Sequence, residues 1–145
     1  MFERVCVASR DYLAKRGIPC TPGDLQHHDC IVYTLLSSGS TWHLRDQEAS
    51  ASGRLRVNSP QAVQEAVGSG IGIAHGPRWL FEAGLSDGSL KLLLDEYAPP
   101  PVPIQLLYVA NRLLPKRAIA FMDFIAAVYS ATPELNVNQL ESGKP

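Results

Sequence analysis

The sequence has little of what would tie a protein to nucleic acid, a membrane or an oxidising compartment. It contains 13 Lys and Arg against 14 Asp and Glu, so there is no excess of positive charge for phosphate contacts. Its three cysteines form no CxxC pair, and an odd number favours reduced thiols over a disulfide framework. No apolar run is long enough to span a bilayer, and no signal peptide is visible. We therefore expect a cytoplasmic protein without membrane contacts.

Motifs for catalysis and metal binding are also missing. No Walker loop or GxGxxG motif follows a strand pattern, and Gly68-Ser69-Gly70 lacks the GxSxG spacing of a hydrolase elbow. His27-His28-Asp29-Cys30 brings together possible metal ligands, but adjacent residues cannot all point at one ion. No second ligand cluster follows at zinc-finger spacing. We therefore expect no enzymatic activity, no cofactor and no metal site, with a small α/β hydrolase as a distant alternative.

Residues 54–77 give the strongest structural signal in the chain. They read RLRVNSPQAVQEAVGSGIGIAHGP, which predicts a strand, a polar turn, an amphipathic helix, a glycine stop and a second strand. Within the helix, apolar residues such as Val63 and Val67 recur at helical spacing. This order is a βαβ unit, which implies a parallel sheet with a right-handed crossover.

Further elements surround this unit in a chain of 145 residues, the size of one domain with or without a short appendage. The sequence predicts strands over 4–9, 29–34, 42–45, 90–94 and 104–110, and helices over 10–16 and 115–129. The proline-rich segment 98–103 is expected to be an extended connector. We predict an α/β fold with a mixed, mainly parallel sheet.

The polar turn Asn58-Ser59 is the best candidate for a binding site. It follows a strand and begins a helix, where free backbone N–H groups and a partial positive charge favour anions. Open α/β sheets bind ligands beyond the carboxyl ends of their strands, although helix capping alone would also explain both residues. Ser9 occupies a similar strand-to-helix turn. His75 ends a strand, where it could line the site or hydrogen-bond to nearby backbone.

Three segments, taken together, resemble the effector-binding region of LysR-type transcriptional regulators. They are VCVASRDYLAKRGIPCTPGDLQHHDCIVY, GRLRVNSPQAVQEAVGSGIGIAHGPRWL and PVPIQLLYVANRLLPKRAIAFMDFI, in the family's order from about residue 4 to residue 126. The resemblance implies a lobe like that of type 2 periplasmic binding proteins in residues 4–97. Residues 98–130 would then supply a crossover strand and the C-terminal helix of a second lobe, and residues 131–145 a flexible tail.

The resemblance also implies a function and partners. A small-molecule effector, with organic anions as one class, would bind at Asn58, Ser59 and the loop that contains Thr34 and Ser37. The family's winged helix-turn-helix is missing from this sequence, so we expect a truncated regulator that reaches DNA only through that missing part. We also expect a homo-oligomer, because the second lobe would lack its early strands. The alternatives are a lobe of a solute-binding protein and a stand-alone small-molecule sensor.

Overall fold

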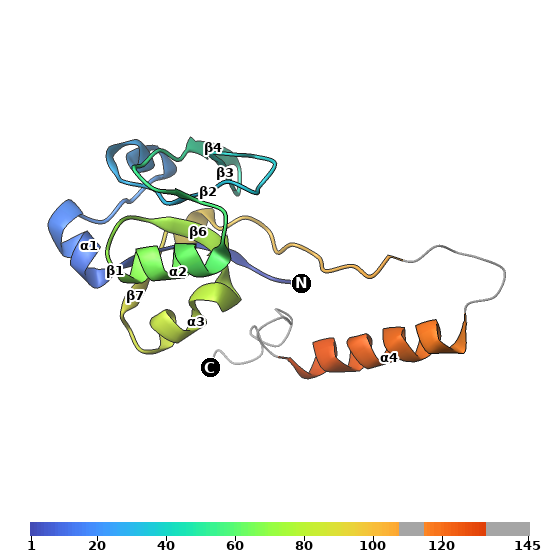
Figure 1. Ribbon diagram of the computed structural model, residues 1–145. Helices are drawn as coiled ribbons and strands as arrows, with labels where there is room; N and C mark the ends of the chain where they lie inside the picture. The colour runs from blue at the N-terminus through green and yellow to red at the C-terminus, as the bar shows by residue number, and fades with distance from the viewer. Residues whose placement is uncertain (108–114, 133–145) are drawn as a thin grey trace. The chain divides into compact units, whose positions relative to one another are not determined.

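The computed structural model describes residues 1–107 and 115–132 (Figure 1). The chain divides into two compact units, one of residues 3–100 and the other of residues 1–2 with 101–145. Its elements are β1 (Arg4–Ser9), α1 (Arg10–Arg16), η1 (Pro22–His27), β2 (Val32–Tyr33), β3 (Thr41–Leu44), β4 (Gln47–Ser50), β5 (Arg56–Val57), α2 (Pro60–Gly68), β6 (Ala74–Pro77), α3 (Arg78–Ser86), β7 (Leu90–Leu93), η2 (Asp95–Tyr97) and α4 (Lys116–Ala131). All but α4 belong to the first unit.

The first unit is built on a mixed sheet in which β1 lies between β6 and β7 and runs antiparallel to both. β2 and β5 form a parallel pair, and a parallel bridge between Cys30 and Ile73 connects that pair to the start of β6. The strands therefore follow the order β5-β2-β6-β1-β7. Four of them run in one direction and β1 runs in the other, which confirms the prediction of a mixed, mainly parallel sheet.

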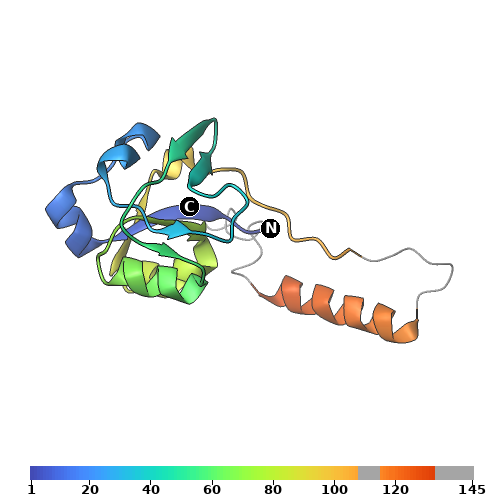
Figure 2. The same ribbon diagram turned by 45° about the horizontal axis from the view of Figure 1, so that its top comes forward.

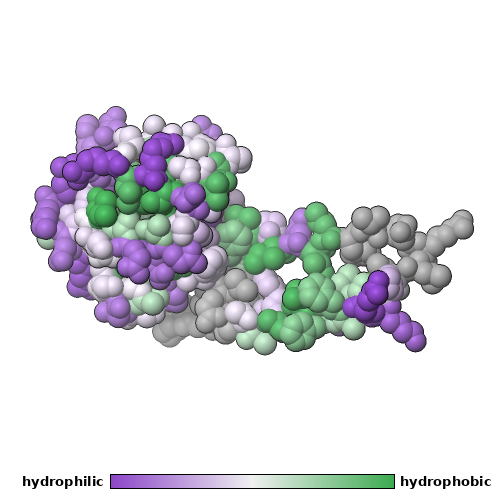
Figure 3. All heavy atoms as spheres, viewed as in Figure 1, coloured by the Kyte–Doolittle hydropathy of each residue, from purple (hydrophilic) through white to green (hydrophobic). Residues whose placement is uncertain are grey.

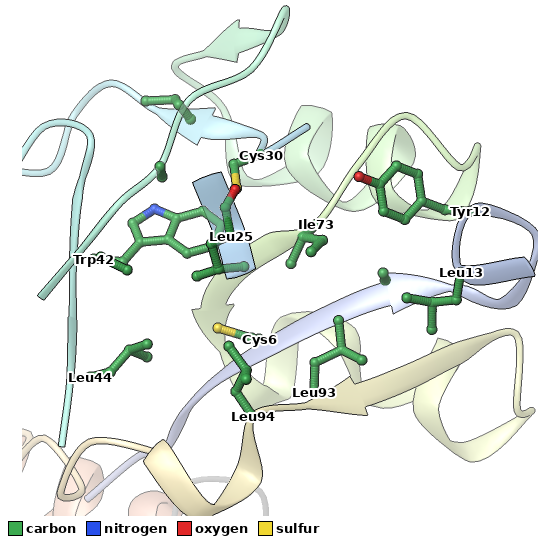
Figure 4. Close-up of a cluster of buried hydrophobic side chains, with 14 residues drawn as sticks. Cys6, Tyr12, Leu13, Leu25, Cys30, Trp42, Leu44, Ile73, Leu93 and Leu94 are labelled. Atoms are coloured by element: carbon green, nitrogen blue, oxygen red, sulfur yellow. The ribbon is translucent and has the colours of Figure 1, made fainter. Parts of the chain in front are cut away.

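Both faces of the sheet are buried, because apolar residues occupy successive positions of β1. Val5 and Val7 belong to a core cluster that includes Val67 of α2 and Phe81 of α3. Cys6 and Ala8 point to the opposite face and a second cluster, whose other members include residues of α1, η1, β2, β3, β4 and β7. Figure 2 shows the β3–β4 hairpin and α2 on opposite sides of β1. The second cluster is drawn in Figure 4, where Cys6 and Leu93 face Trp42 and Leu25.

The β3–β4 hairpin is the main element that the sequence patterns did not predict in full. The sequence predicts the first strand over 42–45 but predicts no strand over residues 46–53, whose polar, small side chains are typical of a turn or hairpin tip. In the structure Gln47–Ser50 pairs antiparallel with Thr41–Leu44. The second strand is mostly exposed and polar, and only Ala49 of its residues is buried, so its alternation is too weak to recognise.

The second unit contains α4 and an antiparallel bridge between Phe2 and Val102. The predicted helix over 115–129 is confirmed by α4. The predicted strand over 104–110 is wrong for residues 104–107, which form no strand, and its last three residues lie outside the described residues. A strand is stable only when a partner satisfies its backbone groups, and residues 104–107 have none in the described part of the chain. Residues 133–145 of the expected tail also lie outside it.

The α4 helix exposes an unusual number of large apolar side chains (Figure 3). Phe124 is 62% exposed and Phe121 is 56% exposed, and Ile119, Ile125 and Val128 are also open to solvent. An amphipathic helix normally buries such a face against another element. None of the helices in residues 1–107 and 115–132 combines the length and the hydropathy needed to cross a membrane.

Candidate functional site

The N-terminus of α2 lies beyond the carboxyl end of β5, as the βαβ pattern predicts. Ser59 caps this helix: its backbone is extended, and its Oγ accepts a hydrogen bond from the N–H of Ala62 at 3.5 Å. The same hydroxyl donates to Oε1 of Gln61 at 2.9 Å. Pro60 has no N–H, and the N–H of Gln61 makes no hydrogen bond within the described part of the chain. One backbone donor at this helix end is therefore available to a ligand.

The side chains at this turn are accessible. Asn58 is exposed and Ser59 is partly exposed, so neither is sealed beneath apolar neighbours. Thr34 follows β2 directly, and its N–H donates to the carbonyl oxygen of Val57 at 2.8 Å. Its Oγ1 donates to the same oxygen at 3.2 Å. These bonds place Thr34 next to the start of the Asn58-Ser59 turn, because β2 and β5 are parallel and end at the same edge of the sheet.

Two other predicted residues lie in different settings. Ser37 is exposed in the loop after β2, and no hydrogen bond links it to Asn58 or Ser59 within residues 1–107. Ser9 lies at the other end of the strands, because β1 is antiparallel to them and Ser9 pairs with Leu90 at the start of β7. Its side chain is buried, and its Oγ accepts a hydrogen bond from the N–H of Tyr12 at 3.2 Å. The structure thus separates Ser9 from the other candidates.

His75 is buried in the structure and has an unusual environment. Its residue is 6% exposed, and neither ring nitrogen has a hydrogen-bond partner in the described part of the chain. The expected bond to nearby backbone is therefore absent there. The ring of Trp42 lies 5.3 Å away, centroid to centroid, at an interplanar angle of 38°. Burial, and then the positive charges of Arg4 and His43, lower the pKa of His75 to about 3, so the ring is neutral near pH 7.

Arg4 is a polar residue of this region that the sequence analysis missed. Its Nε is also buried without a partner, and burial lowers the pKa of its guanidinium. Arg4 makes no ion pair within residues 1–107 and 115–132. The sequence does contain a signal for this residue: Arg4 is a single charged residue at the start of an apolar strand, and charged groups are rarely buried unless they are paired.

In the segment from His27 to Cys30, the side chains of His28 and Asp29 make contacts with other parts of the chain. Asp29 forms ion pairs with Arg16 at 3.9 Å and with Arg54 at 3.5 Å. Nδ1 of His28 lies 3.1 Å from the hydroxyl of Tyr12. Across the residues that the structure describes, no three His, Cys, Asp or Glu side chains are grouped as a metal site would require.

Comparison with known proteins identifies the family. The chain matches the LysR substrate binding domain over residues 1–130, and it belongs to that family. It is 34% identical over 128 residues to the HTH-type transcriptional regulator PtxR of Pseudomonas aeruginosa, covering 84% of this chain and 40% of that protein. It is 28% identical over 123 residues to the HTH-type transcriptional regulator CrgA of Neisseria meningitidis, covering 82% and 41%. The chain thus spans about 40% of these curated relatives.

Solved structures agree with this assignment. The regulatory domain of AphB from Vibrio vulnificus is similar with a TM-score of 0.71 at 26% identity, over 87% of this chain and 64% of that one. The regulatory domain of CrgA has a TM-score of 0.63 at 27% identity, over 68% and 50%. These similarities confirm the predicted LysR effector-binding region and its α/β, periplasmic-binding-protein-like fold.

Proposed function

We propose that this chain is the effector-sensing module of a LysR-type transcriptional regulator and binds a small molecule at Asn58, Ser59 and Thr34. One observation carries the proposal. The helix end at Ser59 is open to solvent, offers the N–H of Gln61, and lies at the carboxyl edge of the sheet in a LysR substrate binding domain. This edge is where open α/β sheets place their ligands.

The chemistry of the edge suits an organic anion. A helix N-terminus carries about half a positive charge, which stabilises a nearby anion by roughly 0.3–1 kcal/mol when exposed. The hydroxyl of Thr34 and the side-chain amide of Asn58 add polar groups beside the free N–H. Ser37 lies on the loop that follows Thr34 and can extend the site on that side. A carboxylate bound here would accept hydrogen bonds without displacing the cap of α2.

We further propose how binding is transmitted. Residues 4–97 form the distal lobe, and residues 98–130 provide the connection and a helix of a second lobe, which a longer polypeptide or a partner chain completes. The exposed apolar side chains of α4 support a missing partner surface. The effector shifts the arrangement of the lobes only by the difference between its affinities for the two arrangements.

The family and its relatives support a regulatory role over a catalytic one. PtxR and CrgA are named as HTH-type transcriptional regulators, and this chain spans about 40% of their length. DNA binding through a winged helix-turn-helix outside this sequence, and assembly into a homo-oligomer, therefore belong to the same proposal. The chain alone is expected not to bind operator DNA specifically.

A thermal-shift screen with small organic acids tests the ligand site. An acid that binds the folded chain raises its melting temperature in a concentration-dependent way. The decisive variant is Ser59→Asp, because aspartate is also a good helix cap but its charge repels an anion. We expect this change to abolish the shift and to leave the fold intact.

Ser52→Asp is the matched control, since it adds the same charge at an exposed serine that precedes β5. It should respond to the acids like the unchanged chain. If acids bind equally well to both variants, or if no acid in a broad panel shifts the melting temperature, the proposed site is wrong.

A further inference from the structure

Arg4 and His75 leave three buried nitrogen atoms without hydrogen-bond partners in the described part of the chain: Nε of Arg4 and both ring nitrogens of His75. An unpaired buried polar group costs about 1–3 kcal/mol, so native proteins keep few of them. Several such atoms together indicate a hydrogen-bond partner that the described part of the chain does not provide.

The two side chains lie on the same face of the sheet. In the antiparallel pairing of β1 with β6, Arg4 is opposite Pro77 and Cys6 is opposite His75. Arg4 and Cys6 are two residues apart on one strand and therefore share a face, which places Arg4 and His75 on one diagonal of the ladder. Arg4 and His43 supply the charges that act on His75. All three groups are basic, although His43 lies 3.1 Å from the carboxylate of Glu48.

A narrow crevice next to Arg4 has mostly apolar walls. Leu44, Leu94, Ala98 and Pro99 line it together with Arg4, and Asp95 also lines it without forming an ion pair with Arg4 in the described residues. The crevice is too narrow for a water molecule, so an occupant has to move a wall.

Leu94 gives a physical reason why a wall could move. Its φ is +54°, and among the described residues it is the single non-glycine residue with a positive φ. This conformation costs a branched residue roughly 1–2 kcal/mol. Strain of this kind is concentrated at ligand clamps and switch regions. A bound molecule that displaces Leu94 would release that strain and open the crevice toward Arg4.

We propose that Arg4 and His75 bind the carboxylate of an apolar monocarboxylic acid, whose hydrocarbon part lies against the wall of the crevice next to Arg4. A guanidinium matches a carboxylate with two parallel hydrogen bonds, and a neutral imidazole adds one N–H. This goes beyond the proposed site at Ser59. Strand β5, which leads to that site, is two positions from β6 in the sheet, or about 10 Å at ordinary strand spacing.

Trp42 can report binding at His75, because the two rings lie 5.3 Å apart, centroid to centroid. The sequence has two tryptophans, so Trp79→Phe leaves Trp42 as the sole source of tryptophan fluorescence. Cyclohexanecarboxylate is a suitable probe because it does not absorb where tryptophan is excited, and cyclohexanecarboxamide is its uncharged control. We expect a saturable change in Trp42 emission with the acid at millimolar concentration and none with the amide.

Arg4→Met keeps a long side chain but removes the charge, and we expect it to weaken the acid at least about tenfold, since hydrogen bonds to charged groups are the stronger ones. His75→Leu removes an unpaired polar group from the core, so it should fold at least as stably and also bind less acid. NMR of the histidine rings gives an independent readout, because a bound carboxylate raises the pKa of His75.

Ser59→Asp separates the two sites. Binding reported by Trp42 should survive this change, whereas the effector site of the previous section should not. If the acid does not alter Trp42 emission, if the amide acts equally, or if Arg4→Met leaves the affinity unchanged, the carboxylate site is refuted. The proposed function at Ser59 is tested independently, by the thermal-shift screen with organic acids.

Discussion

Gly72 lies against the backbone of Asp29, so closely that a Cβ atom at Gly72 would overlap the carbonyl oxygen of Asp29. That oxygen accepts a hydrogen bond from the N–H of Ile73 at 2.8 Å. The contact lies at the parallel bridge between Cys30 and Ile73, which connects the β2–β5 pair to the rest of the sheet. The absence of a side chain at residue 72 is therefore what allows the two parts of the sheet to join.

We expect Gly72→Ala to lower the free energy of unfolding by about 1–3 kcal/mol, the usual cost of overpacking, or more if the bridge opens. Gly68→Ala is the matched control, because a Cβ there meets no atom within 4 Å and alanine favours the helix. Urea unfolding followed by circular dichroism measures both. Equal stabilities for the two variants would show that the Gly72 contact is unimportant.

The sequence predicted this region well because its signals are local. The helical spacing of Val63 and Val67, the Ser59 cap and the glycines after the helix all act within a few residues of each other. A glycine within a strand pattern, such as Gly72, is typical of a close backbone approach, and the structure identifies Asp29 as the neighbour. Such features follow from propensity and spacing without knowledge of the whole fold.

The direction of β1 and the environment of His75 could not be predicted in this way. Alternating valines predict a strand but do not say whether it runs with or against its neighbours, so Ser9 could not be assigned to the other end of the strands. Arg4, which is partly buried, and His75, which is buried, lie beside Leu44 and Trp42 of the β3–β4 hairpin. The second strand of that hairpin is polar and weakly patterned. These properties come from contacts between residues distant in sequence.

The stability of the chain should depend on pH through His75. Its pKa in the folded chain is about 3, because burial and the charges of Arg4 and His43 disfavour the protonated ring. In the unfolded chain a histidine titrates near pH 6.5. Between these values the unfolded chain binds a proton that the folded chain excludes. The contribution of this residue is therefore complete above pH 6.5 and is lost as the pH falls toward 3, by about 2–3 kcal/mol at pH 4.5.

His75→Leu should remove most of this dependence, since leucine does not titrate. His27→Leu is the control, because His27 is exposed and its ring contacts the side chain of Gln26 at the surface. Denaturant unfolding at a series of pH values from 7.5 to 4.5 compares the three proteins. An identical loss of stability in the His75→Leu variant and the unchanged chain would contradict the assignment.

The three free cysteines should differ sharply in reactivity. Cys6 and Cys30 are buried, and burial, as the main cause, raises the pKa of each thiol to about 12. Cys20 is exposed. Because the thiolate is the reactive form, we expect iodoacetamide at pH 8 to modify Cys20 quickly and the other two very slowly. Mass spectrometry should find one label per folded chain and three after denaturation.

Cys20→Ser is the control for this experiment and should leave the folded chain almost unlabelled. Rapid modification of Cys6 would show that the core cluster beneath the β3–β4 hairpin opens far more readily than its packing indicates. Rapid modification of Cys30 alone would place the opening at the bridge to Ile73.

The exposed apolar face of α4 should make the chain self-associate. Phe124 is 62% exposed and Phe121 is 56% exposed, and burying such rings in a second copy would gain about 25 cal/mol for each Å² of apolar surface. We expect Phe124→Glu to shift the chain toward the monomer in analytical ultracentrifugation, because a carboxylate cannot be buried without a partner. Asp123→Asn, an exposed change on the same helix, should leave the association unchanged. A monomeric unchanged chain at high concentration would contradict this expectation and would leave α4 to a different partner surface.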